Sequence, residues 1–248
     1  MYPKFKDWQY CSTFKYDDPN IGGMECPDFY QIKANDGSWH WVLGASVQGD
    51  YSGKVNTFAY WTGDWNGSTF SPDHSSPKWL DYGWDWYASV SWPDHNNPES
   101  QRFYIGWMNN WEYANRNIPT DTSDGYNGQM SIVRTIRLIK TADNDYLIES
   151  YPVKSLENYV NKETKIPDLV VNGSHDINYH GRSYEINLDI SWDQLSNVGI
   201  QVGKSGDGQR HTDIGLFNND TFYVNRQRSE NDGYRFYPWV ESHADFNP

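Results

Sequence analysis

Cysteine is scarce in this sequence, and its scarcity excludes one class of fold. Only two cysteines occur among the 248 residues, Cys11 and Cys26. A domain held together by disulfides carries a larger set of cysteines, so we expect both to be free thiols. A chain of this length can form one large all-β domain or two domains of ordinary size.

Long hydrophobic runs and basic charge are also missing. The mean hydropathy is -0.88, and no apolar run approaches the ~20 residues that a membrane span requires. Acidic residues outnumber basic ones by 33 to 20, for a net charge of -13. This argues against a nucleic-acid partner, because phosphate binding needs clustered basic residues. It fits a neutral, polyhydroxylated substrate. The seven histidines lack metal-ligand spacing, so we expect no metal and no cofactor.

Helical periodicity is scarce too, whereas aromatic residues are abundant. Short β-rich runs alternate with clusters of Gly, Asn, Asp and Pro, which predicts an all-β architecture. Aromatic residues make up 17% of the chain, with 13 Trp and 19 Tyr. We expect most of them to fill a β core and some to stack on the apolar faces of sugar rings.

The predicted strands follow the β-rich runs. They are residues 8–14, 28–33, 39–46, 55–65, 87–92, 102–107, 130–138, 146–152, 183–190, 198–203, 212–217 and 221–225. Consecutive hairpins in the first part are typical of propeller blades. The period-two alternation of residues 183–190 is typical of a half-buried sheet. Residues 153–160 are expected to form a short helix or an irregular connector.

One segment places a carboxylate on constrained backbone. It runs from Gly22 to Tyr30 and reads Gly-Gly-Met-Glu-Cys-Pro-Asp-Phe-Tyr. Glycines permit backbone angles that side chains forbid, and Pro27 fixes its own φ and favours an extended Cys26. Glu25, held on such backbone beside a thiol, is a candidate general acid. A solvated glutamate in a glycine-rich turn is the alternative that this segment alone leaves open.

Three further motifs follow along the chain. Residues 85–88 read Asp-Trp-Tyr-Ala, residues 105–113 read Ile-Gly-Trp-Met-Asn-Asn-Trp-Glu-Tyr, and residues 128–134 read Gly-Gln-Met-Ser-Ile-Val-Arg. Each motif is short, but in this order after the Glu-Cys-Pro segment they resemble glycoside hydrolase family 32. That is the family of levanases, inulinases and invertases. The resemblance covers nearly the whole chain, is looser after about Leu138, and implies a five-bladed β-propeller followed by a β-sandwich.

The resemblance also implies roles for individual residues. Glu25 corresponds to the general acid/base, and Cys26 beside it is expected to influence its ionisation. Asp85 corresponds to a residue that hydrogen-bonds the fructosyl unit, and Trp111 to a tryptophan that stacks on the furanose ring. A turn or capping role for Asp85 and a core position for Trp111 are the alternatives. Arg134 is expected to form an ion pair between domains.

The family's nucleophile, an Asp in a Trp-Met-Asn-Asp-Pro-Asn-like motif, has no counterpart that we accept. Asp18 begins an Asp-Pro-Asn sequence, but it directly precedes the Glu25 segment, where the family varies. Asp28 lies three residues after Glu25, and in an extended strand the two side chains would point to opposite faces. We therefore expect an internal fragment, with a partial five-bladed β-propeller at residues 1–150 and an incomplete β-sandwich at residues 151–248.

The expected function follows from the resemblance. It is that of a retaining β-fructosidase acting on terminal fructosyl units of levan, inulin or sucrose. Retaining glycosidases need a second carboxyl group about 5 Å from the acid/base, so this chain alone is expected to be inactive. A non-catalytic fructan-binding protein and a fructosyltransferase are the alternatives left open. The expected location is extracellular or at the cell surface.

Overall fold

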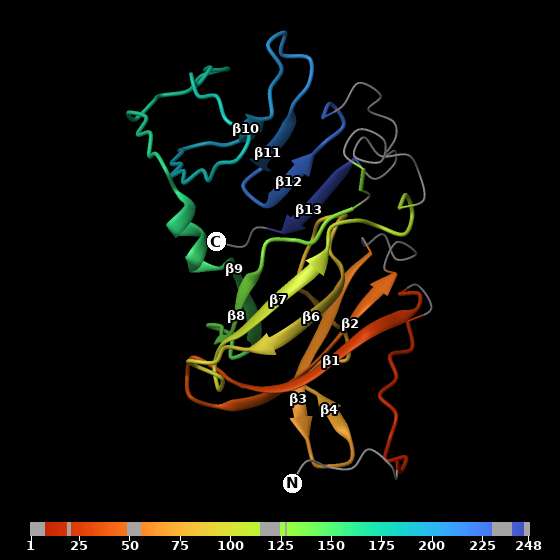
Figure 1. Ribbon diagram of the computed structural model, residues 1–248. Helices are drawn as coiled ribbons and strands as arrows, with labels where there is room; N and C mark the ends of the chain where they lie inside the picture. The colour runs from red at the N-terminus through yellow and green to blue at the C-terminus, as the bar shows by residue number, and fades with distance from the viewer. Residues whose placement is uncertain are drawn as a thin grey trace. The chain divides into compact units, whose positions relative to one another are not determined.

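The computed structural model describes residues 8–18, 21–48, 56–114, 125–126, 128–229 and 240–245. These residues form antiparallel β-sheets, and the chain divides into two compact units, residues 1–153 and 154–248 (Figure 1). The predicted all-β fold class is confirmed. The assignment of residues 1–150 to a propeller part and 151–248 to a sandwich stays a proposal.

The first sheet of unit 1 connects consecutive strands. Its strands are β1 (Met24–Lys33), β2 (Trp39–Gln48), β3 (Asn56–Trp65), β4 (Phe70–Pro72) and β5 (Lys78–Trp79). The order across the sheet is β1-β2-β3-β4, and β5 also pairs with β3. The turn between β1 and β2 is stabilised by its own residues. Gly37 has a φ of 88°, and the Asp36 carboxylate accepts hydrogen bonds from the backbone N–H and the hydroxyl of Ser38.

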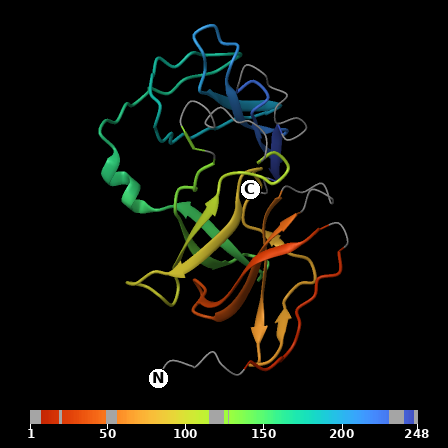
Figure 2. The ribbon, with the colours of Figure 1, turned by 45° about the vertical axis from the view of Figure 1, so that its right-hand side comes forward.

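The second sheet of unit 1 is a four-stranded meander. Its strands are β6 (Tyr87–Pro93), β7 (Arg102–Trp107), β8 (Arg134–Lys140) and β9 (Tyr146–Pro152), in the order β6-β7-β8-β9. A four-stranded antiparallel meander is the form of a propeller blade. Strand β6 contacts β1, β2 and β3, so the yellow-to-green second sheet lies beside the red-to-orange first sheet (Figure 2).

The core of unit 1 lies between these two sheets. The buried cluster draws on both of them and comprises Tyr30, Ile32, Ala34, Val42, Phe58, Tyr60, Leu80, Trp86, Tyr104, Ile136 and Leu138. One glycine is required by close packing, because a Cβ atom on Gly44 would lie 2.2 Å from the Phe58 ring. A second buried cluster, formed by Ile21, Ala45, Val47, Ala59, Trp61 and Phe70, covers the other face of the first sheet.

Unit 2 begins with a short helix and contains one described sheet. The elements are the 3-10 helix η2 (Lys154–Tyr159) and the strands β10 (Asn197–Val202), β11 (Thr212–Phe217), β12 (Thr221–Asn225) and β13 (Glu241–Asp245). The four strands pair in chain order. The expectation of a short helix or connector at residues 153–160 is confirmed, and β11 and β12 have the predicted bounds.

Two predicted strands are wrong. Residues 8–14 form no strand, and this segment is held instead by the Phe14 ring against Trp61 and Phe70. Residues 183–190 keep their period-two pattern but form no strand, and every one of them is exposed. Alternation makes a segment fit for a sheet, but a strand exists only when a neighbour supplies its hydrogen bonds.

Candidate functional site

Glu25 lies on β1 where the strand is irregular. Glu25 pairs with Ser46 and Asp28 pairs with Gly44, so three steps along β1 oppose two steps along β2. This count defines a β-bulge. Cys26, the residue after Glu25, has a φ of 49°, a conformation that residues with a side chain rarely adopt. The Glu25 side chain is exposed, so the bulge presents it at the surface.

Strand β6 carries a bulge of the same form. Tyr87 pairs with Trp107 and Val90 pairs with Ile105, again three steps against two. Ala88, the residue after Tyr87, has a φ of 50°. Tyr87 therefore occupies in the second sheet the position that Glu25 occupies in the first.

These two bulge positions contact each other. The Tyr87 hydroxyl donates a hydrogen bond of 2.6 Å to Oε2 of Glu25. The Tyr87 ring is buried, and burial raises the pKa of Tyr87 well above its usual value, with the adjacent Glu25 carboxylate adding to the effect. The contact joins the Glu-Cys-Pro segment to the Asp-Trp-Tyr-Ala motif. Sequence reasoning selected only the Asp of that second motif and missed Tyr87.

Asp85 connects the second motif to the third. Its side chain is half-buried, and Oδ1 accepts a hydrogen bond from the hydroxyl of Tyr113. Tyr113 is buried and sits in a turn that closes where its backbone N–H donates to the Asn110 carbonyl at 3.1 Å. Tyr113 belongs to the third motif but was not selected from the sequence. Its hydroxyl now gives Asp85 a fixed partner.

Trp111 lies next to this contact chain and faces solvent. It is 57% exposed, and its ring lies 5.1 Å from that of Trp107, at an interplanar angle of 58°. Trp107 is the cross-strand partner of Tyr87. Separate contacts therefore join Glu25 to Tyr87, Trp111 to Trp107 and Asp85 to Tyr113. An exposed aromatic ring of this kind is suited to stacking on a sugar.

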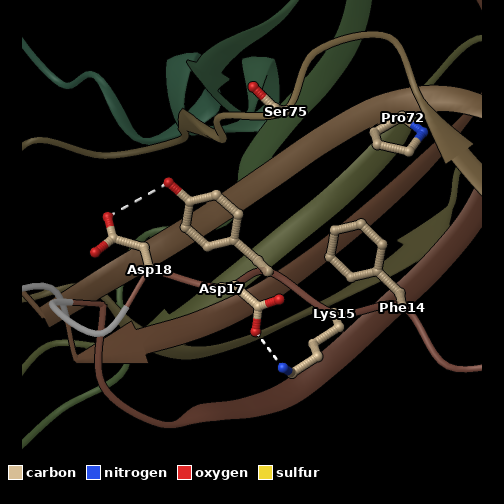
Figure 3. A pocket seen from close by; sticks show the side chains of 7 residues that line it. Phe14, Lys15, Asp17, Asp18, Pro72 and Ser75 are labelled. Carbon is tan, nitrogen blue, oxygen red and sulfur yellow. Dashed lines mark hydrogen bonds and ion pairs between the residues drawn. The ribbon is translucent and has the colours of Figure 1, made fainter.

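Cys26 and Asp18 occupy different surroundings. Cys26 is an exposed free thiol beside Glu25, and Cys11 is also an exposed free thiol. Asp18 accepts a 3.4 Å hydrogen bond from the Tyr16 hydroxyl. Tyr16 and Asp18 line a groove of about 540 Å³. Its other lining residues are Phe14, Lys15, Asp17, Pro72 and Ser75 (Figure 3). None of the family-matched site residues lines this groove. The rest of the Asp-Pro-Asn sequence, Pro19 and Asn20, lies outside the described residues.

The ion pair described for Arg134 lies within unit 1. Arg134 lies at the start of β8, and its guanidinium forms an ion pair of 2.7 Å with Asp81, inside unit 1. It also lies 3.8 Å from the centre of the Trp86 ring. A planar guanidinium can pair with a carboxylate and stack on an aromatic face together. Arg134 therefore anchors the loop before β6, close to the residues that carry the second motif.

Among the residues that the structure describes, no group of three or more His, Cys, Asp or Glu side chains is placed to hold a metal ion. No helix of the described residues has the length and apolar character to cross a membrane.

Comparisons with known proteins place the chain in a family. Residues 3–150 match the model described as "Glycosyl hydrolases family 32 N-terminal domain", and residues 152–247 match "Glycosyl hydrolases family 32 C terminal". The levanbiose-producing levanase of Geobacillus stearothermophilus is 42% identical over 98% of this chain and 60% of its own length. The levanbiose-producing levanase of Bacillus subtilis is also 42% identical, over 98% of this chain and 46% of its own length. The chain thus spans about half the length of these curated relatives.

A solved structure shows the same fold. A fructofuranosidase variant from Schwanniomyces occidentalis, in complex with fructosylnystose, superposes with a TM-score of 0.60 at 19% identity. The match covers 91% of this chain and 46% of that protein. Its fold is a β-propeller followed by a β-sandwich. With two family models covering residues 3–247 between them, the conclusion is that this chain belongs to glycosyl hydrolase family 32.

Proposed function

We propose that the chain serves in β-fructoside hydrolysis, with Glu25 as the general acid/base. The observation that supports this role is the hydrogen bond between Tyr87 and Glu25 across two matching bulges. It holds an exposed carboxylate at a defined place on rigid strands, as proton transfer to a bound substrate requires. In this mechanism Glu25 protonates the leaving glycosidic oxygen and later removes a proton from the attacking water.

The substrate-binding roles of Asp85, Trp111 and Cys26 are part of the proposal. Asp85, which accepts a hydrogen bond from the Tyr113 hydroxyl at Oδ1, is the side chain that we assign to a fructosyl hydroxyl. Trp111 supplies an exposed ring for stacking. Cys26 lies directly beside the acid/base, on the same bulge. These residues come from three segments that the hydrogen bonds and ring contacts link.

Among the candidate fructans, we propose levan as the substrate. Both relatives at 42% identity are named levanbiose-producing levanases, whereas the exo-inulinase of Aspergillus niger is 27% identical over 90% of this chain. Four Aspergillus exo-inulinase relatives are named extracellular, and we propose an extracellular or cell-surface location here as well.

The test is a chimera with a relative that is already a complete levanase. The 245-residue matching region of the Geobacillus stearothermophilus enzyme is replaced by this chain, and sugar release from levan is measured. We expect activity, and a loss of about 10²–10⁴-fold on Glu25→Gln, the usual worth of general acid/base catalysis. Glu99→Gln is the matched control, because Glu99 is also exposed, with 62% of its side chain accessible.

The products separate the possible outcomes. Short fructosides and fructose indicate hydrolysis, whereas longer oligosaccharides formed from added sucrose indicate transfer. A folded chimera that binds levan but releases nothing contradicts the proposal and supports a binding protein. The unfused chain is expected to release no sugar at a useful rate, because a retaining mechanism needs a second carboxylate and the resemblance assigns none in these 248 residues.

A further inference from the structure

Asp85 and Trp111, two side chains that we propose to bind the sugar, lie on separate segments. Asp85 lies in the loop before β6, and Trp111 lies in the turn after β7. Strands β6 and β7 come between them in the chain. A carboxylate and a ring that hold one sugar unit must keep a fixed spacing, because a displacement of about 1 Å weakens such a site. A contact that fixes this spacing is therefore part of the site.

Asn110 bridges these two segments through its side chain. It directly precedes Trp111 and is buried. Its Nδ2 atom donates a hydrogen bond of 2.9 Å to the backbone carbonyl of Trp84, the residue before Asp85. Its Oδ1 atom accepts a hydrogen bond of 2.9 Å from the backbone N–H of Glu112, the residue after Trp111. One amide group therefore contacts the neighbours of both sugar-binding residues.

The backbone of Asn110 is held as well as its side chain. Its N–H donates to Oδ1 of Asn109 at 2.8 Å, and its carbonyl accepts from the backbone N–H of Tyr113 at 3.1 Å. Tyr113 in turn donates its hydroxyl to Asp85. The turn that carries Trp111 is thereby joined to the Asp85 segment twice, once through the Asn110 amide and once through Tyr113.

An amide fits both contacts of this bridge in a way that a carboxylate or an apolar side chain does not. The Trp84 carbonyl can only accept a hydrogen bond and the Glu112 N–H can only donate one, so the bridging group must supply one donor and one acceptor. A buried amide lowers the stability of a fold unless its polar atoms are bonded, and here both ends are. An aspartate would keep the acceptor and lose the donor.

We propose that Asn110 is a positioning residue of this site: it sets the spacing between the Asp85 carboxylate and the Trp111 ring, so that both contact the same sugar unit. Because its side chain is buried, it acts through these two residues and not on the substrate. The inference rests on the proposed function for its purpose, since the sugar-binding roles belong to that proposal, but the bridge itself is measured without turnover.

The test uses the full chain and three variants. Asn110→Asp keeps the acceptor for Glu112 and removes the donor to Trp84, so it cuts the bridge at one end. Asn110→Ala removes both ends. Asn97→Asp is the matched control, because Asn97 is an exposed loop residue of the same unit whose Oδ1 atom accepts a hydrogen bond from Ser100, and the substitution adds the same charge.

Two NMR signals report the two sides of the bridge. The ¹³Cζ resonance of Tyr113, assigned with Tyr113→Phe, reports the hydrogen bond to Asp85. The ¹⁹F resonance of Trp111, in a chain labelled with fluorotryptophan and assigned with Trp111→Phe, reports the surroundings of the ring. The midpoint of thermal unfolding shows whether each variant is folded.

In Asn110→Asp we expect the Tyr113 resonance to move toward its position in Asp85→Asn. In Asn110→Ala the Trp111 resonance should move as well, because the turn bond to Glu112 is also lost. In the levanase chimera, Asn110→Asp should raise the KM for levan by roughly 2–10-fold, the share of affinity that an aromatic contact contributes. The kcat should stay near its wild-type value, as for a loss of uniform binding. Asn97→Asp should change none of these quantities.

Lowering the pH separates the lost donor from a general packing defect. Burial makes a carboxyl group take up its proton at a higher pH than the ~4 of an exposed one. Once protonated, the carboxyl group introduced by Asn110→Asp can donate to the Trp84 carbonyl again, so the Tyr113 resonance should return toward the wild-type value. Asn110→Ala should show no such return. The wild type at the same pH corrects for titration of Asp85 and Glu112.

The inference is overturned if the Tyr113 resonance keeps its wild-type position in both Asn110 variants, or if Asn97→Asp moves it equally. It is equally overturned if low pH restores nothing in Asn110→Asp, if the KM for levan stays unchanged, or if both Asn110 variants are unfolded, since Asn110 would then be an ordinary residue of the turn. A failure of the proposed function is seen elsewhere, in a chimera that is inactive or indifferent to Glu25→Gln.

Discussion

The hydrogen bond between Tyr87 and Glu25 should appear as a coupling free energy between two substitutions. Tyr87→Phe removes only the hydroxyl and keeps the buried ring, while Glu25→Gln removes the charge. A hydrogen bond to a charged group contributes about 1.5–3 kcal/mol. Because Glu25 is exposed, water replaces part of that, and we expect each single variant to lose about 1 kcal/mol, or roughly 2–4 °C in the unfolding midpoint.

A double-mutant cycle isolates this contact. Urea unfolding of the wild type, both single variants and the double variant should give a coupling of about 1 kcal/mol, since the second substitution finds the bond already lost. The matched control combines Tyr87→Phe with Glu99→Gln, whose carboxylate pairs with Lys33 at 3.7 Å. Additivity of Tyr87→Phe and Glu25→Gln within about 0.5 kcal/mol, the usual error of such cycles, would refute the contact.

The same contact affects the ionisation of Tyr87. Burial and the neighbouring carboxylate both disfavour the phenolate and raise the pKa of Tyr87. Glu25→Gln removes the second cause, so the pKa of Tyr87 should fall, although burial keeps it above the usual value of 10.0. Titration of the Tyr87 ¹³Cζ resonance measures this directly. An unchanged or higher pKa would contradict the reasoning.

Three further predictions concern the packing and pH dependence of unit 1. Gly44→Ala should destabilise it by about 1–3 kcal/mol, because the new Cβ meets the Phe58 ring and overpacking costs that much; an unchanged urea midpoint would contradict this. Arg134→Met should lower the free energy of unfolding by about 3 kcal/mol, because it leaves the largely buried Asp81 unpaired. An unchanged midpoint of thermal unfolding would contradict this. Burial raises the pKa of Tyr30 above 10.0, so its stabilising effect is complete below about pH 10 and is lost as pH rises further. Tyr30→Phe should therefore weaken the fall of stability above pH 10, and an identical fall in the variant would argue against this cause.

Much of the fold could be read from local patterns. Residues 212–217 and 221–225 alternate in short runs between turn residues, and they form β11 and β12 with the predicted bounds. The hairpin at Gly37 follows from its Asn-Asp-Gly turn sequence. These features depend on a few neighbouring residues, so the sequence carries them directly. The motif around Glu25 and its family were also recognisable from the order of short segments.

The tertiary structure decided which side chains meet. The alternation of residues 183–190 did not make a strand, because no neighbour among the described residues pairs with it. The bulge after Glu25 turned Asp28 to the same face, and its counterpart after Tyr87 brought the hydroxyl within 2.6 Å of Glu25. The sequence by itself determined the class of fold and the family. The register of β1 against β2 and the packing of one sheet on another are set by residues far apart in the chain, and only these long-range contacts assemble the site.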